Sequence, residues 1–111
     1  MNYSIKAIPS FERDVKVLSK KYPSFKSDLI KLRELLNNDP KSGIPLGNSC
    51  YKIRIPIASK NKGKSGGARV ITQVVSVNEI EGVIYLLAIY DKSEQENISD
   101  KQILTLLKEI S

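Results

Sequence analysis

Two adjacent segments of helical periodicity, separated by one proline, constrain the fold of this chain more than any other feature of its sequence. Their apolar residues recur at intervals of four, three and four positions, as Phe11, Val15, Leu18 and Tyr22, and again as Phe25, Leu29, Leu32 and Leu36. Pro23 ends the first helix, and Ser24 is predicted to cap the second. Because the connection is so short, the two helices are expected to pack as an antiparallel hairpin on one side of a sheet.

Segments with strand character supply that sheet. Four of them alternate in polarity or are rich in β-branched residues, namely 2–8, 51–55, 68–77 and 83–91. Pro9 ends the first, and Ser10 is predicted as the N-cap of the helix that follows. Residues 78–82 form a predicted hairpin turn, whereas residues 41–49, which contain glycine and proline, are predicted to form a loop.

A last helix completes the fold. Ser99 and Gln102 have the spacing of a capping box, and the apolar stripe after them is expected to pack on the protein's own core. The resulting order, β-α-α-β-β-β-α, predicts the α+β class, with an N-terminal helical hairpin packed on one face of a small, mostly antiparallel sheet. The opposite face is expected to be basic. A chain of 111 residues has the size of one domain, which we place at residues 1–111.

The excess positive charge lies in one continuous stretch. The chain has a formal net charge of +6, and from Pro40 to Asn78 there is no acidic residue. The same stretch carries seven cations, Lys41, Lys52, Arg54, Lys60, Lys62, Lys64 and Arg69. Charge segregated in this way indicates a cationic surface for an anionic partner, of which nucleic acid is favoured.

Absent residue types exclude several kinds of chemistry. The chain has no histidine and one cysteine, Cys50, which excludes a His-liganded zinc site, a thiolate cluster and a catalytic unit based on histidine. We therefore expect neither a metal nor a cofactor. One cysteine cannot form an internal disulfide, no apolar run could cross a bilayer, and the first residues lack a signal core. The sequence predicts a cytoplasmic protein that makes no membrane contact.

The predicted strands bring the cations together. Lys52 and Arg54 are two positions apart on one strand, so their side chains leave the same face about 7 Å apart, which is close to the spacing of phosphates. Arg69 begins the adjoining strand. Cleavage of RNA by its own 2′-OH needs a base, cations at the phosphate and an acid for the leaving oxygen, and lysine and arginine can serve these roles without a metal. The alternative is a solvated polar face beside a flexible basic loop.

Four segments resemble the RelE/HigB branch of the RelE/ParE toxin superfamily. They are Cys-Tyr-Lys-Ile-Arg-Ile at 50–55, Gly-Lys-Ser-Gly-Gly-Ala-Arg-Val-Ile at 63–71, Ala-Ile-Tyr-Asp-Lys-Ser-Glu at 88–94 and Asn-Ile-Ser at 97–99. The resemblance implies the RelE-like fold along essentially the whole chain. It also implies a toxin of a type II toxin–antitoxin system that acts as a ribosome-dependent mRNA interferase, cutting mRNA in the A site without a cofactor.

The resemblance assigns roles by position. Lys52 matches the family's first catalytic basic residue, which activates the 2′-OH or holds the phosphate. Arg54 stands where RelE has a lysine. Because arginine is a poorer base than lysine, the resemblance implies that Arg54 stabilises charge rather than acting as a base. Arg69 matches the arginine at the scissile phosphate, and Lys92 stands where a second arginine protonates the leaving group.

Further contacts follow from the same resemblance. The C-terminal tyrosine that stacks on a base in RelE corresponds to Ile98 here, and nearby Tyr90 is a candidate substitute or a buried strand residue. The loop cations Lys60, Lys62 and Lys64 are expected to contact RNA or the ribosome. The implied partners are a cognate antitoxin protein, mRNA and the 30S A site.

Two other functions remain open. ParE-like members share the fold but inhibit DNA gyrase by binding, and they lack the catalytic cations. A noncatalytic RNA- or ribosome-binding module would fit the loss of the tyrosine at Ile98. The combination of Lys52, Arg54, Arg69 and Lys92 favours the nuclease over both.

Overall fold

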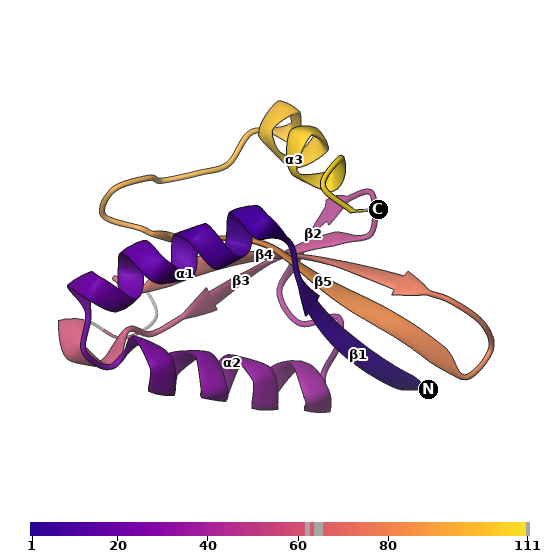
Figure 1. Ribbon diagram of the computed structural model, residues 1–111, viewed down its shortest axis with the longest axis horizontal. Coiled ribbons are helices and arrows are strands. Elements are labelled where there is room, and N and C mark those ends of the chain that lie inside the picture. The colour runs from indigo at the N-terminus through magenta and orange to yellow at the C-terminus, as the bar shows by residue number, and fades with distance from the viewer. Residues whose placement is uncertain (62, 64–65, 111) are drawn as a thin grey trace.

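The computed structural model of the protein, which describes residues 1–61, 63 and 66–110, is built on a sheet with the strand order β1-β5-β4-β3-β2 (Figure 1). The strands are β1 (Asn2–Ala7), β2 (Ile44–Gly47), β3 (Cys50–Ile55), β4 (Ala68–Ser76) and β5 (Glu81–Asp91). β1 and β5 run parallel, and the other neighbouring pairs are antiparallel. The helices are α1 (Pro9–Lys21), α2 (Phe25–Asn38), the short 3-10 helix η1 (Ala58–Lys60) and α3 (Asp100–Leu107). These elements confirm the α+β class and the mostly antiparallel sheet.

β2 is a strand where the sequence predicted a loop. It pairs with β3, with Ile44 opposite Lys52, and a register irregularity lies between Pro45 and Gly47. Proline has no amide hydrogen to donate to a neighbouring strand, so within sheets it is tolerated mainly at an edge. The strand is therefore short and confined to the edge. Its proline and glycine are typical of loops, which is why the sequence pattern did not indicate a strand.

α1 begins two residues earlier than the predicted cap implies. Ile8 is the N-cap and Pro9 occupies the first turn, where its fixed φ suits the helix and its missing N–H would have had no helical partner. The prediction that Ser10 caps this helix is wrong. Instead, the amide and the hydroxyl of Ser10 both donate to the carboxylate of Glu109, beyond the end of α3.

α1 and β1 share one edge of β5. β1 pairs with β5 only as far as Leu86, and α1 packs against the rest of the strand. The Asp14 carboxylate accepts a hydrogen bond of 3.1 Å from the Ile89 amide, which would otherwise face outward from this edge. Burial raises the pKa of Asp14, although the Ile89 hydrogen bond opposes that rise. α1 thus takes the place of the missing length of strand.

α2 and α3 lie on opposite sides of the sheet, below and above it in Figure 1. Ser24 is the N-cap of α2, but its hydroxyl donates to Asp28 at 2.8 Å rather than accepting from the helix backbone. The capping box of Ser99 and Gln102 is confirmed at the start of α3. Ile103 of α3 is buried in the core, as its apolar stripe predicted. Across residues 1–61, 63 and 66–110, no helix is both long and apolar enough to span a membrane.

Candidate nucleic-acid interface

A row of three side chains crosses the sheet on the face away from α2. Arg54 of β3 lies opposite Arg69 of β4, which in turn lies opposite Tyr90 of β5. Lys52 is two residues from Arg54 on the same strand, so it projects on the same side. The intervening Ile53 is buried and faces the core. We call Lys52, Arg54, Arg69 and Tyr90 the basic face.

Arg69 is the buried member of the basic face, with 4% of its surface exposed. Burial lowers the pKa of its guanidinium, and the neighbouring charge of Arg54 lowers it further. Its Nη1 donates to the Ala68 carbonyl at 3.2 Å, which orients the side chain. Arginine nevertheless stays protonated in proteins, so two fixed positive charges stand on adjacent strands. Both guanidiniums have the geometry to donate hydrogen bonds to a phosphate.

Lys52 links the basic face to the segment before α3. Its ammonium lies 3.4 Å from Oδ1 of Asn97, and the side chain is half-buried. The backbone of Gly43 presses against the same residue, since a Cβ at Gly43 would lie 2.4 Å from the Lys52 carbonyl oxygen. The Lys52 backbone is therefore held against Gly43, while its ammonium reaches toward Asn97.

Tyr90 borders a cavity of about 430 Å³ between the start of α1, β5 and α3. Ile98, which replaces the tyrosine that the resemblance leads one to expect, lines the same cavity. Burial raises the pKa of Tyr90, and the charge of Arg69 opposes that rise. The Tyr90 hydroxyl is buried and has no hydrogen-bond partner among the residues that the structure describes. Tyr90 is thus a partly buried strand residue whose ring also lines the cavity.

Lys92 lies just beyond the end of β5, two residues after Tyr90. Its amide donates to the Gly67 carbonyl at 3.1 Å, and its side chain is half-buried. Gly67 must approach β3 closely, because a Cβ there would lie 2.0 Å from the Ile55 carbonyl oxygen. The glycine thus serves the contact between the two strands.

Lys60 was expected on the RNA-binding loop, and its charge is engaged elsewhere. Its ammonium lies 2.7 Å from Oδ1 of Asp91, and 10% of the side chain is exposed. The same ammonium also stands 5.7 Å from the centre of the Tyr22 ring. These contacts indicate a structural role. Lys62 and Lys64 lie outside the described residues.

Asp91 is the residue of this region to which the sequence assigned no role. Its carboxylate is fully buried and accepts hydrogen bonds from Lys60, from the Tyr22 hydroxyl and from both the amide and the hydroxyl of Ser93. Burial raises the pKa of Asp91, but these hydrogen bonds outweigh burial and hold the pKa well below its usual range. Asp91 lies in residues 88–94, one of the four segments that carry the resemblance, but the sequence does not indicate that its carboxylate is buried.

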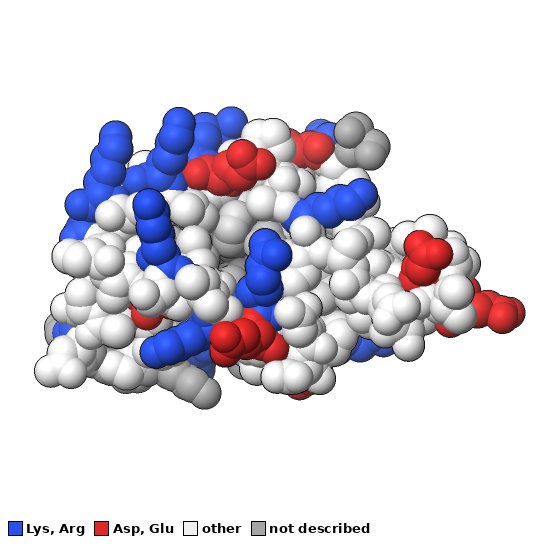
Figure 2. Space-filling model, turned by 60° about the horizontal axis from the view of Figure 1, so that its bottom comes forward, with Lys and Arg blue, Asp and Glu red and all other residues white. Residues whose placement is uncertain are grey.

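Charge is unevenly distributed over the face of the molecule that Figure 2 shows. Lysines and arginines gather over the left half of the molecule in Figure 2, and acidic side chains stand at the far right, where the β4–β5 hairpin ends. That hairpin carries the exposed Glu79 and Glu81. Within the part of the chain that the structure describes, no group of three or more histidine, cysteine or acidic residues could hold a metal ion.

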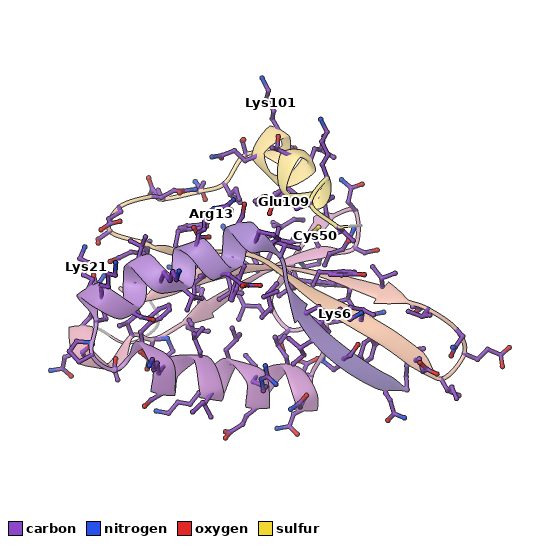
Figure 3. The ribbon with its side chains drawn as sticks, viewed as in Figure 1. Lys6, Arg13, Lys21, Cys50, Lys101 and Glu109 are labelled. Carbon is purple, nitrogen blue, oxygen red and sulfur yellow. The ribbon has the colours of Figure 1, made fainter. Side chains whose placement is uncertain are left out.

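Residues of α3, together with Glu109 beyond its end, line one side of the cavity beside Tyr90. Glu109, which lines it, turns toward the start of α1, where Arg13 also lies (Figure 3). Arg13 donates to the Ser10 hydroxyl at 3.0 Å, and Ser10 donates to Glu109. The hydrogen bonds from Ser10 lower the pKa of Glu109. The end of α3 is thus tied to the start of α1 at the wall of the cavity.

Known proteins match this chain in structure but not in sequence. No protein-family model matches it, and no curated protein sequence does. Among solved structures, it is similar to a double arginine-to-alanine mutant of the E. coli toxin RelE in the free state, with 19% identity, a TM-score of 0.57 and 100% of both chains covered. The likeness shows that the chain has a RelE-like fold.

Proposed function

We propose that the protein is the toxin of a type II toxin–antitoxin system and acts as a ribosome-dependent mRNA interferase of the HigB-like branch. The observation that carries this proposal is the register that brings Lys52, Arg54 and Arg69 together on one face of a RelE-like sheet. A binding protein would need positive charge but not this grouping around a buried guanidinium.

The proposed reaction is an attack of the 2′-oxygen on the adjacent phosphorus of mRNA in the A site. The new bond is 2′-O–P, the bond to the 5′-oxygen breaks, and the products carry a 2′,3′-cyclic phosphate and a 5′-hydroxyl. Arg54 and Arg69 stabilise the charge that develops on the phosphoryl oxygens. Lys52 activates the 2′-OH or holds the phosphate, and Lys92 protonates the departing 5′-oxygen. No step requires a metal or a cofactor.

Burial of Arg69 suits this role. A guanidinium that is already desolvated makes stronger contacts with an oxyanion than one in water, and its geometry allows two parallel hydrogen bonds. The ring of Tyr90, next along the row, offers an apolar surface for the flanking base. In this proposal the partners are mRNA, the 30S A site and an antitoxin, and the protein works in the cytoplasm, where translation takes place.

Primer extension on one defined mRNA tests the proposal. We would compare wild-type protein, Arg69→Ala and the distant control Lys6→Ala, each with and without purified ribosomes. Cuts within the A-site codon that require ribosomes, vanish in Arg69→Ala and persist in Lys6→Ala are the expected result. Intact mRNA with unaffected translation would contradict it and make gyrase supercoiling the next assay. Blocked translation of intact mRNA would indicate a noncatalytic ribosome-binding protein.

A further inference from the structure

The Asp91 carboxylate joins three separate parts of the chain. It accepts hydrogen bonds from the Lys60 ammonium of η1 (2.7 Å), from the Tyr22 hydroxyl at the end of α1, and from the Ser93 hydroxyl in the turn after β5 (2.7 Å). Lys21 adds a further positive charge at 3.8 Å. A carboxylate buried this deeply is stable as an anion only because these donors compensate it.

The turn that Asp91 organises carries Lys92. Asp91 accepts from the Ser93 amide at 3.0 Å through its side chain, and from the amides of Glu94 and Gln95 through its carbonyl. Lys92 itself is held by the bond from its amide to Gly67. The Lys92 backbone therefore lies between two fixed points, and the Asp91 carboxylate supplies one of them.

We propose that Asp91 is a positioning residue that sets Lys92 where it can protonate the leaving 5′-oxygen. This inference rests on the proposed function, because it assigns Asp91 to the same reaction. Asp91 itself does not touch RNA, since its carboxylate is buried and surrounded by its own donors.

Charge alone predicts a different outcome. Replacing Asp91 with asparagine removes a negative charge near the basic face, which would strengthen attraction to RNA. If the carboxylate only adjusted the field, Asp91→Asn would bind ribosomes more tightly and cleave at least as fast. If the carboxylate positions Lys92, the cleavage rate of Asp91→Asn falls even though its attraction to RNA does not. The loss of activity then appears in kcat, with KM unchanged or lower.

A substrate with a better leaving group gives the decisive test. We would measure single-turnover cleavage of ribosome-bound mRNA with either the natural 5′-oxygen or a bridging 5′-sulfur at the cut site. A thiolate leaves without protonation, so a defect in the general acid disappears with the sulfur substrate. We expect Lys92→Ala to lose roughly 10²-fold and Asp91→Asn at least about 10-fold with oxygen, and both to recover to within about 3-fold of wild type with sulfur.

Matched variants define the specificity of that rescue. Arg69→Ala acts at the phosphate, so the sulfur substrate should not rescue it. Asp39→Asn makes the same chemical change at an exposed position and should leave both rates unchanged. An Asp91→Asn defect equally large with both substrates would overturn the proposal. If that variant fails to fold, Ser93→Ala, which removes one donor from the turn, should show a smaller defect with the same rescue.

A second measurement remains informative if the wild-type protein cleaves neither substrate. In that case the proposed function fails, and amide hydrogen exchange still decides whether Asp91 orders this turn. We expect the Lys92 amide to exchange at least about 10-fold faster in Asp91→Asn, while the Val70 amide in the middle of β4 is unchanged. Equal exchange at Lys92 in both proteins would contradict a positioning role, whatever the function.

Discussion

At the scale of single residues, the basic face brings two like charges side by side. Arg54 and Arg69 stand directly opposite on neighbouring strands, and cross-strand pairs of like charge destabilise a sheet. In the proposed function, a bound phosphate would interact favourably with both charges. Stability and RNA binding should therefore respond in opposite directions when one of these charges is removed.

Arg54→Gln tests that opposition. We expect the free energy of unfolding to rise by a few tenths of a kcal/mol, because an exposed cation opposite Arg69 is lost. Affinity for a short single-stranded RNA should fall, and the slope of log K against log salt should decrease in magnitude by about 0.7. Urea unfolding and a salt titration measure the two effects. Lys6→Gln is the control, and an equal change of slope in that variant would contradict a role specific to the basic face.

Tyr90→Phe separates the ring from the hydroxyl. The hydroxyl is buried without a partner among the described residues, so its removal should raise the free energy of unfolding by about 1 kcal/mol. The ring remains available for stacking, and the cleavage rate should be unchanged. A loss of cleavage larger than about 10-fold would instead assign the hydroxyl to the chemistry.

Sequence could predict part of this site and not the rest. The alternation of residues 51–55 places Lys52 and Arg54 on one face, and the observed pairing with β4 agrees with it. The ion pair of Lys60 with Asp91 could not be predicted, because it joins residues 31 positions apart through burial at the end of a strand. Counting the lysines of this loop in the sequence therefore overestimates the positive charge available to RNA, because Lys60 is paired with Asp91.

At the scale of elements, contacts between distant parts of the chain decide what periodicity cannot. The helical hairpin and the capping box of α3 follow from local patterns, and both are observed. β2 escaped prediction because an edge strand of four residues has too little pattern to detect. The start of α1 escaped because Ser10 could serve as a cap, and its use by Glu109 depends on a tertiary contact.

Gly67→Ala tests the close approach of β3 and β4. The added Cβ would meet the Ile55 carbonyl oxygen, a backbone atom that cannot rotate away. We expect a loss of more than about 2 kcal/mol in the free energy of unfolding. Gly47→Ala is the matched control, because nothing lies within 4 Å of its Cβ and only its positive φ of 88° is unfavourable. Equal losses in the two variants would argue against the steric explanation.

At the scale of the whole molecule, the buried ion pair around Asp91 connects stability to pH. A carboxyl whose pKa is lower in the folded state stabilises the protein above its unfolded pKa, which is about 3.9 for aspartate, and that contribution is lost as the pH falls further. The contribution is therefore complete near neutral pH and declines below about pH 4.

Asp91→Asn should reveal that dependence. We expect the variant to be less stable than wild type at pH 7, and the difference between them to shrink steadily below about pH 4. Urea unfolding of both proteins at pH 7 and about pH 3 measures it. A difference that stays constant with pH would show that the loss comes from packing rather than from the charge of Asp91.

Single-turnover cleavage with analysis of the product ends tests whether the basic face cleaves mRNA on the ribosome. Ribosomes programmed with one end-labelled mRNA would be mixed with excess wild-type protein or Arg69→Ala. We expect one cut in the A-site codon, a 2′,3′-cyclic phosphate on the upstream fragment, and a rate reduced at least about 10²-fold in Arg69→Ala. Cleavage that leaves other ends, or that proceeds equally fast in Arg69→Ala, would contradict that expectation.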